Sequence, residues 1–184
     1  MAVRVEPSEF RYVFYESTEI AGVVEALLGP FGFAADTDVA VKIDESVPMG
    51  RARIDSVDPI VFAMESGALE DSKRLRQFGH REAVDVFGRL LLQVCDRRDP
   101  TFGVPDLDAD LPLAHRTAWL VYCAGRQSRA GFPTQRQRRL YAFRTRHGFS
   151  DAADATFAAI WAGEGLVWAD LVRMSDSCAA PAVR

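Results

Sequence analysis

The stretch HREAVDVFGRLLLQVCDRR, residues 80–98, contains the longest uninterrupted helical pattern in the chain. Its apolar side chains recur at the i, i+3, i+4, i+7 spacing that gathers them on one face of a helix. These positions are Ala83, Val84, Phe87, Leu90, Leu91, Val94 and Cys95. Arg81, Asp85 and Arg89 fall on the opposite face, where each ion pair adds only about 0.2–0.5 kcal/mol in water. Burial of one apolar side chain adds roughly 1.5–3 kcal/mol, so we expect packing to fix this helix while its charges face solvent.

Short segments of β-branched and aromatic residues precede this helix and predict a β-α-β-β-β order. The strands are expected over 10–15, 39–43, 51–55 and 60–64. The helix is expected to begin at the capping residues Ser17 and Thr18 and to end at Gly29 and Pro30. A further short helix is predicted over 69–78, between two glycines.

The second half of the chain predicts helices. They are expected over 113–129, from a Thr134–Gln137 capping box to Gly148, over 151–162 after Ser150, and over 168–174. The fold class is therefore α+β: a small mixed sheet with one crossover helix, followed by a largely helical half packed on that sheet. We expect a single domain over 1–184, with a sheet-forming part (8–66), a helical part (67–174) and a loose tail (175–184).

Composition limits the class of protein. The chain has 184 residues, of which 48% are hydrophobic, as expected of a folded domain. It has no run of about 18 apolar residues, so no membrane span is expected, and its first residues lack the apolar stretch of a signal peptide. The cysteines Cys95, Cys123 and Cys178 are odd in number and widely spaced, which favours free thiols in the cytoplasm.

Charge is distributed unevenly. Residues 1–72 hold 14 acidic and 5 basic side chains, whereas residues 126–147 hold seven arginines and no acid. One interpretation is that the arginines form ion pairs with acidic residues of the same protein. The other is that they form a surface that binds phosphate or nucleic acid. Because the arginines of the helix after Pro133 point all round its axis, nucleic acid is the less favoured partner.

The start of the predicted helix at residue 80 contains a histidine and a glutamate, the residue types of a metal site. The element order is similar to that of zincin-like peptidases, whose zinc helix carries a second histidine four residues after the first. Here that position is Val84, and Glu82 projects about 160° from His80. The loop aspartates at 106, 108 and 110 lack the glycine and glutamate of a calcium loop. The sequence therefore predicts no metal and no cofactor.

The favoured site lies on the predicted helix 113–129. Four side chains fall within about 60° of one another on the helix, and a fifth, Arg129, lies beside them. The four are His115, Trp119, Tyr122 and Arg126. Aromatic rings provide flat contact area, and arginine provides a planar fork of donors for carboxylate or phosphate. We therefore expect a ligand- or partner-binding accessory protein that takes a small anionic ligand or a peptide in the cleft between the sheet and the helices. The alternative interpretation is that these aromatic rings pack inside the protein.

An enzyme is the other class considered. A hydrolase would need acid and base side chains that converge within hydrogen-bonding reach. The weak candidates are Glu65, His80, Glu82 and His115. Ser66 and Cys95 have no base placed beside them by local sequence.

Overall fold

The computed structural model describes residues 3–105, 107 and 110–178. It confirms an α+β fold with a four-stranded mixed sheet and a helical second half. The chain forms two compact units that divide between Cys95 and Asp96, here called unit 1 (1–95) and unit 2 (96–184). Whether the two units fold as a single domain stays a prediction. No helix among the described residues is long and apolar enough to cross a membrane.

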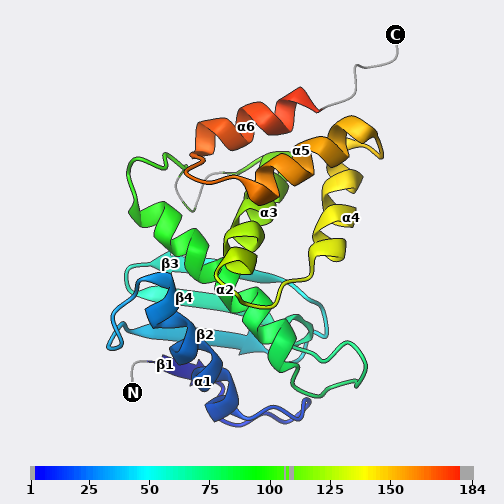
Figure 1. Ribbon diagram of the computed structural model, residues 1–184. Coiled ribbons are helices and arrows are strands. Elements are labelled where there is room, and N and C mark those ends of the chain that lie inside the picture. Colours follow the sequence, from blue (N-terminus) through cyan, green and yellow to red (C-terminus); the bar gives the residue numbers. More distant parts are fainter. Residues whose placement is uncertain (1–2, 106, 108–109, 179–184) are drawn as a thin grey trace. The chain divides into compact units, whose positions relative to one another are not determined.

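The sheet of unit 1 has the strand order β1-β2-β4-β3. The strands are β1 (Val3–Glu6), β2 (Val39–Asp44), β3 (Ala52–Val57) and β4 (Ile60–Glu65). β2 pairs in parallel with both β1 and β4, and β3 pairs antiparallel with β4 at one edge (Figure 1). The connections that leave β1, β2 and β4 therefore start at the same end of the sheet.

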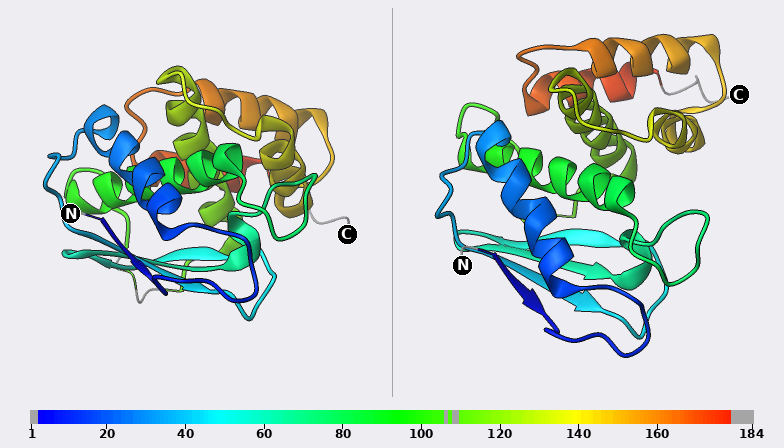
Figure 2. Two further views of the ribbon diagram at one scale, coloured as in Figure 1. Left: turned by 90° about the horizontal axis from the view of Figure 1, so that it is seen from below. Right: turned by 60° about the horizontal axis from the view of Figure 1, so that its bottom comes forward.

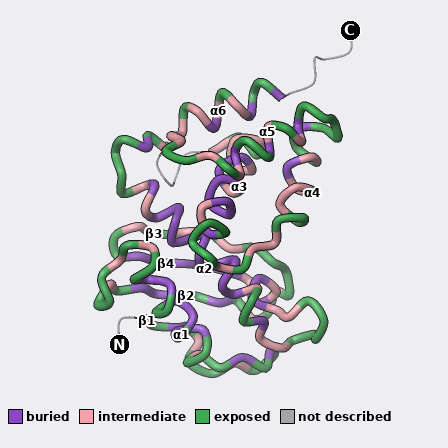
Figure 3. The backbone as a smooth tube through the Cα atoms, viewed as in Figure 1, coloured by how far each residue is buried: buried purple, intermediate pink, exposed green. Residues whose placement is uncertain are grey.

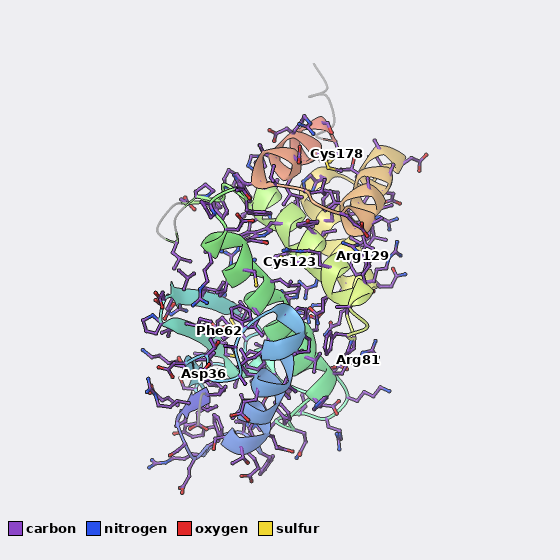
Figure 4. All side chains as sticks on the ribbon, turned by 60° about the vertical axis from the view of Figure 1, so that its left-hand side comes forward. Asp36, Phe62, Arg81, Cys123, Arg129 and Cys178 are labelled. Atoms are coloured by element: carbon purple, nitrogen blue, oxygen red, sulfur yellow. The ribbon has the colours of Figure 1, made fainter. Side chains whose placement is uncertain are left out.

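Helices cover one face of this sheet: α1 (Ser17–Leu28), which is followed by the 3-10 turn Gly29–Phe31, and α2 (His80–Arg98) (Figure 2). Alternate residues of the central strands face the helices and are buried, among them Val41 and Phe62. Figure 3 shows this burial along β2 and β4, and Figure 4 places Phe62 on the sheet. The other face of the sheet carries charged side chains such as Lys42 and Arg53, so the sheet is buried on one side only.

Two predicted elements of unit 1 are wrong. Residues 10–15 form no strand, although their side chains do alternate between exposed and buried. Their backbone has no neighbouring strand, and the N–H groups of Arg11 and Tyr12 bond to the Glu45 carboxylate. Residues 69–78 form no helix; only a 3-10 turn, Ser66–Ala68, follows β4. The loop beyond it is held by the side chains of Asp71 and Glu70, which accept bonds from nearby backbone N–H groups and so compete with helical bonds.

The helix α2 forms over the predicted residues, and its apolar face is buried. The prediction that its charges face solvent is wrong for Asp85 and Arg89, which are 1% and 8% exposed. Their side chains pair with each other at 3.2 Å, so the buried carboxylate has a partner of opposite charge.

Unit 2 is built around α3 (Leu113–Arg129), which contacts three further helices. These are α4 (Arg136–His147), α5 (Asp151–Ala162) and α6 (Trp168–Ser177). The predicted cap of α5 is confirmed, because the Ser150 hydroxyl accepts from Ala153 N at 3.2 Å. The predicted Thr134 cap is wrong: α4 begins two residues later and has no side-chain cap. The helix α6 continues into the predicted tail as far as Ser177, while residues 179–184 lie outside the described part of the chain.

Gly125 allows α3 and α5 to approach closely. A Cβ atom at this position would overlap the main-chain carbonyl of Trp161 on α5. Gly22, on the exposed side of α1, has no atom within 4 Å of the corresponding position. Both glycines have a helical backbone, so they differ only in how closely another segment packs on them.

We predict opposite effects of alanine at these two positions. Gly125→Ala should lower the free energy of unfolding by about 1–3 kcal/mol, because backbone must move to admit the methyl group. Gly22→Ala should raise it by up to about 1 kcal/mol, since alanine is the better helix former and nothing is displaced. Urea unfolding measures both, and a stabilising Gly125→Ala would contradict this packing of α3 on α5.

Candidate functional site

The aromatic residues of the predicted α3 site are buried. Trp119 and Tyr122 are 1% and 3% exposed. Phe102 lies against both rings, with centroids 6.0 Å and 6.5 Å away, and Trp168 packs on Trp119 at 5.8 Å. The expectation of an accessible aromatic line along α3 is therefore corrected, because neighbours within unit 2 cover it.

A carboxylate from the same unit occupies the position expected for an anionic ligand. Asp96, near the end of α2, accepts a bond from Trp119 Nε1 at 2.6 Å. The Arg126 guanidinium donates to both oxygens of the same carboxylate, at 2.8 Å and 2.5 Å, and lies 4.4 Å from the Tyr122 ring centroid. The chemistry predicted for this face is thus present, but its anion is internal.

The other two residues of the predicted site also have partners inside unit 2. His115 Nε2 lies 2.7 Å from Asp176 Oδ1 on α6. Arg129, labelled in Figure 4, donates to the carbonyl oxygens of Trp161 and Gly163 at 2.5 Å and 2.6 Å. These contacts tie α3 to α6 and to the end of α5.

The acid and base candidates within unit 1 do not converge. Glu65 accepts from Arg51 N at 3.2 Å, His80 is exposed at the start of α2, and Glu82, two residues further along the helix, is half-buried. Among the described residues of unit 1, no hydrogen bond joins any two of these three candidates. The described residues also contain no group of three histidine, cysteine or carboxylate side chains placed to hold a metal ion.

Several arginines of the segment 126–147 have partners inside unit 2. Arg126 pairs with Asp96, Arg129 approaches Glu164 at 3.9 Å, and Arg144 pairs with Asp154. Arg136 lies over the rings of Phe157 and Trp161, 5.4 Å and 5.6 Å from their centroids. Acidic partners within unit 2 therefore offset at least three of the seven arginines, and a fourth packs on aromatic rings.

A buried histidine–serine pair joins α4 to α6. His147 and Ser175 are 4% and 1% exposed, and His147 Nε2 lies 2.8 Å from Ser175 Oγ. The other ring nitrogen, Nδ1, lies 3.0 Å from the Phe143 carbonyl and must donate to it. In the neutral ring the Ser175 hydroxyl therefore donates to Nε2. Burial lowers the pKa of His147, so the ring is held neutral.

The structure reveals a pocket in unit 1 that the sequence did not predict. Its volume is about 270 Å³. It lies where three loops meet at the carboxyl ends of the parallel strands: 7–16 after β1, 45–51 after β2 and 66–79 after β4. We call it the loop pocket. Its lining residues are Tyr12, Val13, Glu45, Ser46, Pro48, Ser66, Glu70 and Arg76.

Hydrogen bonds between the three loops fix the walls of the loop pocket. Glu45 Oε2 accepts from the backbone N–H groups of both Arg11 and Tyr12 at 2.7 Å. The Tyr15 hydroxyl donates to the Ser66 carbonyl at 2.8 Å, and Phe14 N donates to Arg76 O at 2.8 Å. Burial, together with the nearby Glu70 charge, raises the pKa of Tyr15, so its phenol stays protonated and can donate.

One residue of the loop pocket has a strained backbone. Arg76 has a φ of 60° and is the only non-glycine residue with positive φ in the described part of the chain. Its N–H donates to Glu70 Oε1 at 2.7 Å, and its carbonyl accepts from Phe14, so bonds on both sides hold this conformation. Strain of this kind costs of order 1–3 kcal/mol and occurs preferentially at functional sites.

Exposed apolar side chains lie on the three loops that form the loop pocket, and one of them, Tyr12, lines it. Of the seven large apolar side chains that are exposed among the described residues, four lie on these three loops. They are Tyr12, Phe14, Met49 and Leu75. Two contacts show how closely these loops pack: a Cβ at Gly67 would overlap the backbone of Pro48 and Met49, and Phe14 N bonds to the carbonyl of Arg76, the residue after Leu75. An exposed apolar group of this kind is typical of an interaction site.

Comparisons with known proteins found no matching family model, no matching curated protein and no matching solved structure.

We predict that Asp96→Ala lowers the free energy of unfolding by about 3–5 kcal/mol, because it leaves the Arg126 charge and the Trp119 N–H without their carboxylate. Asp154→Ala is the matched control, since it removes a more exposed partner of an arginine and should cost much less. Urea unfolding compares the two, and equal costs would contradict the assigned role of Asp96.

We predict that the stability of unit 2 depends on the protonation of His147. Because burial lowers its folded pKa, its contribution is complete above the unfolded value of 6.5 and is lost as the pH falls from that value through the lower folded pKa. The loss is at most about 1.4 kcal/mol per pH unit. Unfolding measured from pH 7.5 to pH 5 should show this slope, and His147→Gln should reduce it. An identical slope in the variant would contradict the assignment.

Proposed function

We propose that this protein is a non-enzymatic binding protein that takes an apolar side chain of a partner polypeptide into the loop pocket of unit 1. The observation that carries this proposal is a pocket formed by three loops that also carry four exposed apolar side chains, one of which, Tyr12, lines the pocket. Their position at the carboxyl ends of parallel strands is where sheets of this kind commonly bind ligands.

The size of the pocket favours a side chain over a complete cofactor. Small-molecule sites usually enclose about 300–1,000 Å³, and the loop pocket encloses about 270 Å³. The surrounding apolar side chains extend the contact onto three loops, from Phe14 on the first to Met49 and Leu75 on the others. A peptide could insert one anchor residue into the pocket and lay its neighbouring residues on the exposed apolar side chains of the three loops.

The loops are arranged to bind without a large ordering cost. The bonds from Glu45, Tyr15 and Phe14 hold them together in the free protein. Loops that are already ordered lose less conformational entropy when a partner binds. This supports a recognition surface more than a lid that must close.

The proposal keeps the accessory-protein role that the sequence suggested but moves its site from α3 to unit 1. We place the protein in the cytoplasm, a location supported by the three free thiols. The hydrolase alternative has no supporting contact among Glu65, His80 and Glu82. An anionic ligand on α3 would have to displace Asp96 from Trp119 and Arg126.

We predict that peptides selected on this protein from a random twelve-residue phage library depend on Tyr12 and Phe14. Tyr12→Ala and Phe14→Ala should each weaken the selected peptides at least tenfold in calorimetry, because anchors at the centre of an interface dominate its affinity. The matched control is Tyr141→Ala, since Tyr141 is 66% exposed and Tyr12 is 62% exposed. It should leave affinity unchanged.

The opposite pattern would contradict the proposal. Peptides that bind Tyr12→Ala and Phe14→Ala normally but fail on Tyr141→Ala would place the interaction surface on α4. Thermal unfolding of each variant distinguishes loss of a contact from loss of the fold, and both tyrosines are exposed enough to be replaced without a cavity.

A further inference from the structure

We infer that the partner segment carries a lysine or arginine next to its apolar anchor, and that the carboxylates of Glu45 and Glu70 bind this cation. This inference rests on the proposed function of the loop pocket and specifies the chemistry of the partner. It uses the two lining residues that carry negative charge.

Each carboxylate holds the loops through one oxygen and leaves the other available. Glu45 binds the backbone N–H groups of residues 11 and 12 through Oε2, and Glu70 binds Arg76 N through Oε1. No described residue donates a hydrogen bond to Glu45 Oε1 or to Glu70 Oε2. The fixed oxygens position the two side chains, and the remaining oxygens are acceptors for an ammonium or guanidinium group.

The charge around the pocket favours a cation. Unit 1 holds 16 acidic and 10 basic residues, a formal net charge of −6. Arg76 is the one basic side chain of the lining, and its exposed guanidinium forms no ion pair with any described residue. Two like charges in one pocket repel each other, and a bound cation relieves that repulsion.

The pocket also has an apolar wall next to these carboxylates. Val13 and Pro48 line the same pocket, and Val13 is buried while Pro48 is exposed. The aliphatic stem of a lysine or arginine can lie on such a surface while its charged end reaches a carboxylate. A purely apolar partner would leave both carboxylates unpaired, and an anionic partner would be repelled by them.

The test compares Glu45→Gln and Glu70→Gln with the unmodified protein, using the peptides selected from the random twelve-residue library. Glutamine keeps an oxygen that can accept the backbone bonds but removes the charge. Each substitution should weaken the selected peptides about fivefold, and the loss should shrink in 0.5 M salt. Glu25→Gln on α1 is the control, because it removes one exposed charge away from the pocket and should leave affinity unchanged.

Two further readouts complete the test. The selected peptides should be enriched in lysine or arginine beside a large apolar residue, and Arg76→Ala should tighten their binding by removing the competing cation. If Glu45→Gln fails to fold, Glu70→Gln and Arg76→Ala still decide the outcome.

The inference and the proposed function fail in different ways. Peptides that need Tyr12 but show no basic enrichment and bind Glu70→Gln normally would overturn the charge inference alone. Peptides that bind without Tyr12 and Phe14 would overturn the proposed function, and the inference with it.

Discussion

The parallel pairing of β2 with β1 and β4 is the constraint on which unit 1 depends. Parallel strands direct their outgoing loops to one end of the sheet, so three loops far apart in the sequence must share a small space there. Their backbone polar groups need partners, and the loops supply them to one another through Glu45, Glu70 and the Tyr15 hydroxyl. These bonds hold a pocket open on loops that also carry exposed apolar side chains.

Unit 2 depends on a different interaction, the buried carboxylate of Asp96. Asp96, the first residue of unit 2, bonds to Trp119 and Arg126 of α3 within the same unit. The buried Asp96 carboxylate is tolerated only with donors such as these. The aromatic and cationic side chains of α3 therefore serve as its partners. This is why a face with the composition of a ligand site is closed.

The helices with strong apolar periodicity and the three strands predicted over 39–43, 51–55 and 60–64 were predictable from sequence, and the site was not. The patterns over 80–98 and 113–129 gave the correct elements because burial dominates their energetics. The alternation over 10–15 was misleading, since a strand also needs a neighbour and β1 lies earlier in the chain.

Sequence could indicate the stripe on α3 but not that Asp96 closes it, because that contact spans 23 residues. The loop pocket had no local signature, as its residues come from three separate loops.

The most direct test of the central claim, that unit 1 binds a cationic apolar segment in the loop pocket, is a backbone amide NMR titration. The probe is a capped Lys-Phe-Leu-Lys peptide added to the full chain. The account predicts shift changes concentrated in residues 11–16, 45–51 and 66–78, where the three loops meet. Changes confined to residues 113–147, or no change up to millimolar peptide, would contradict it.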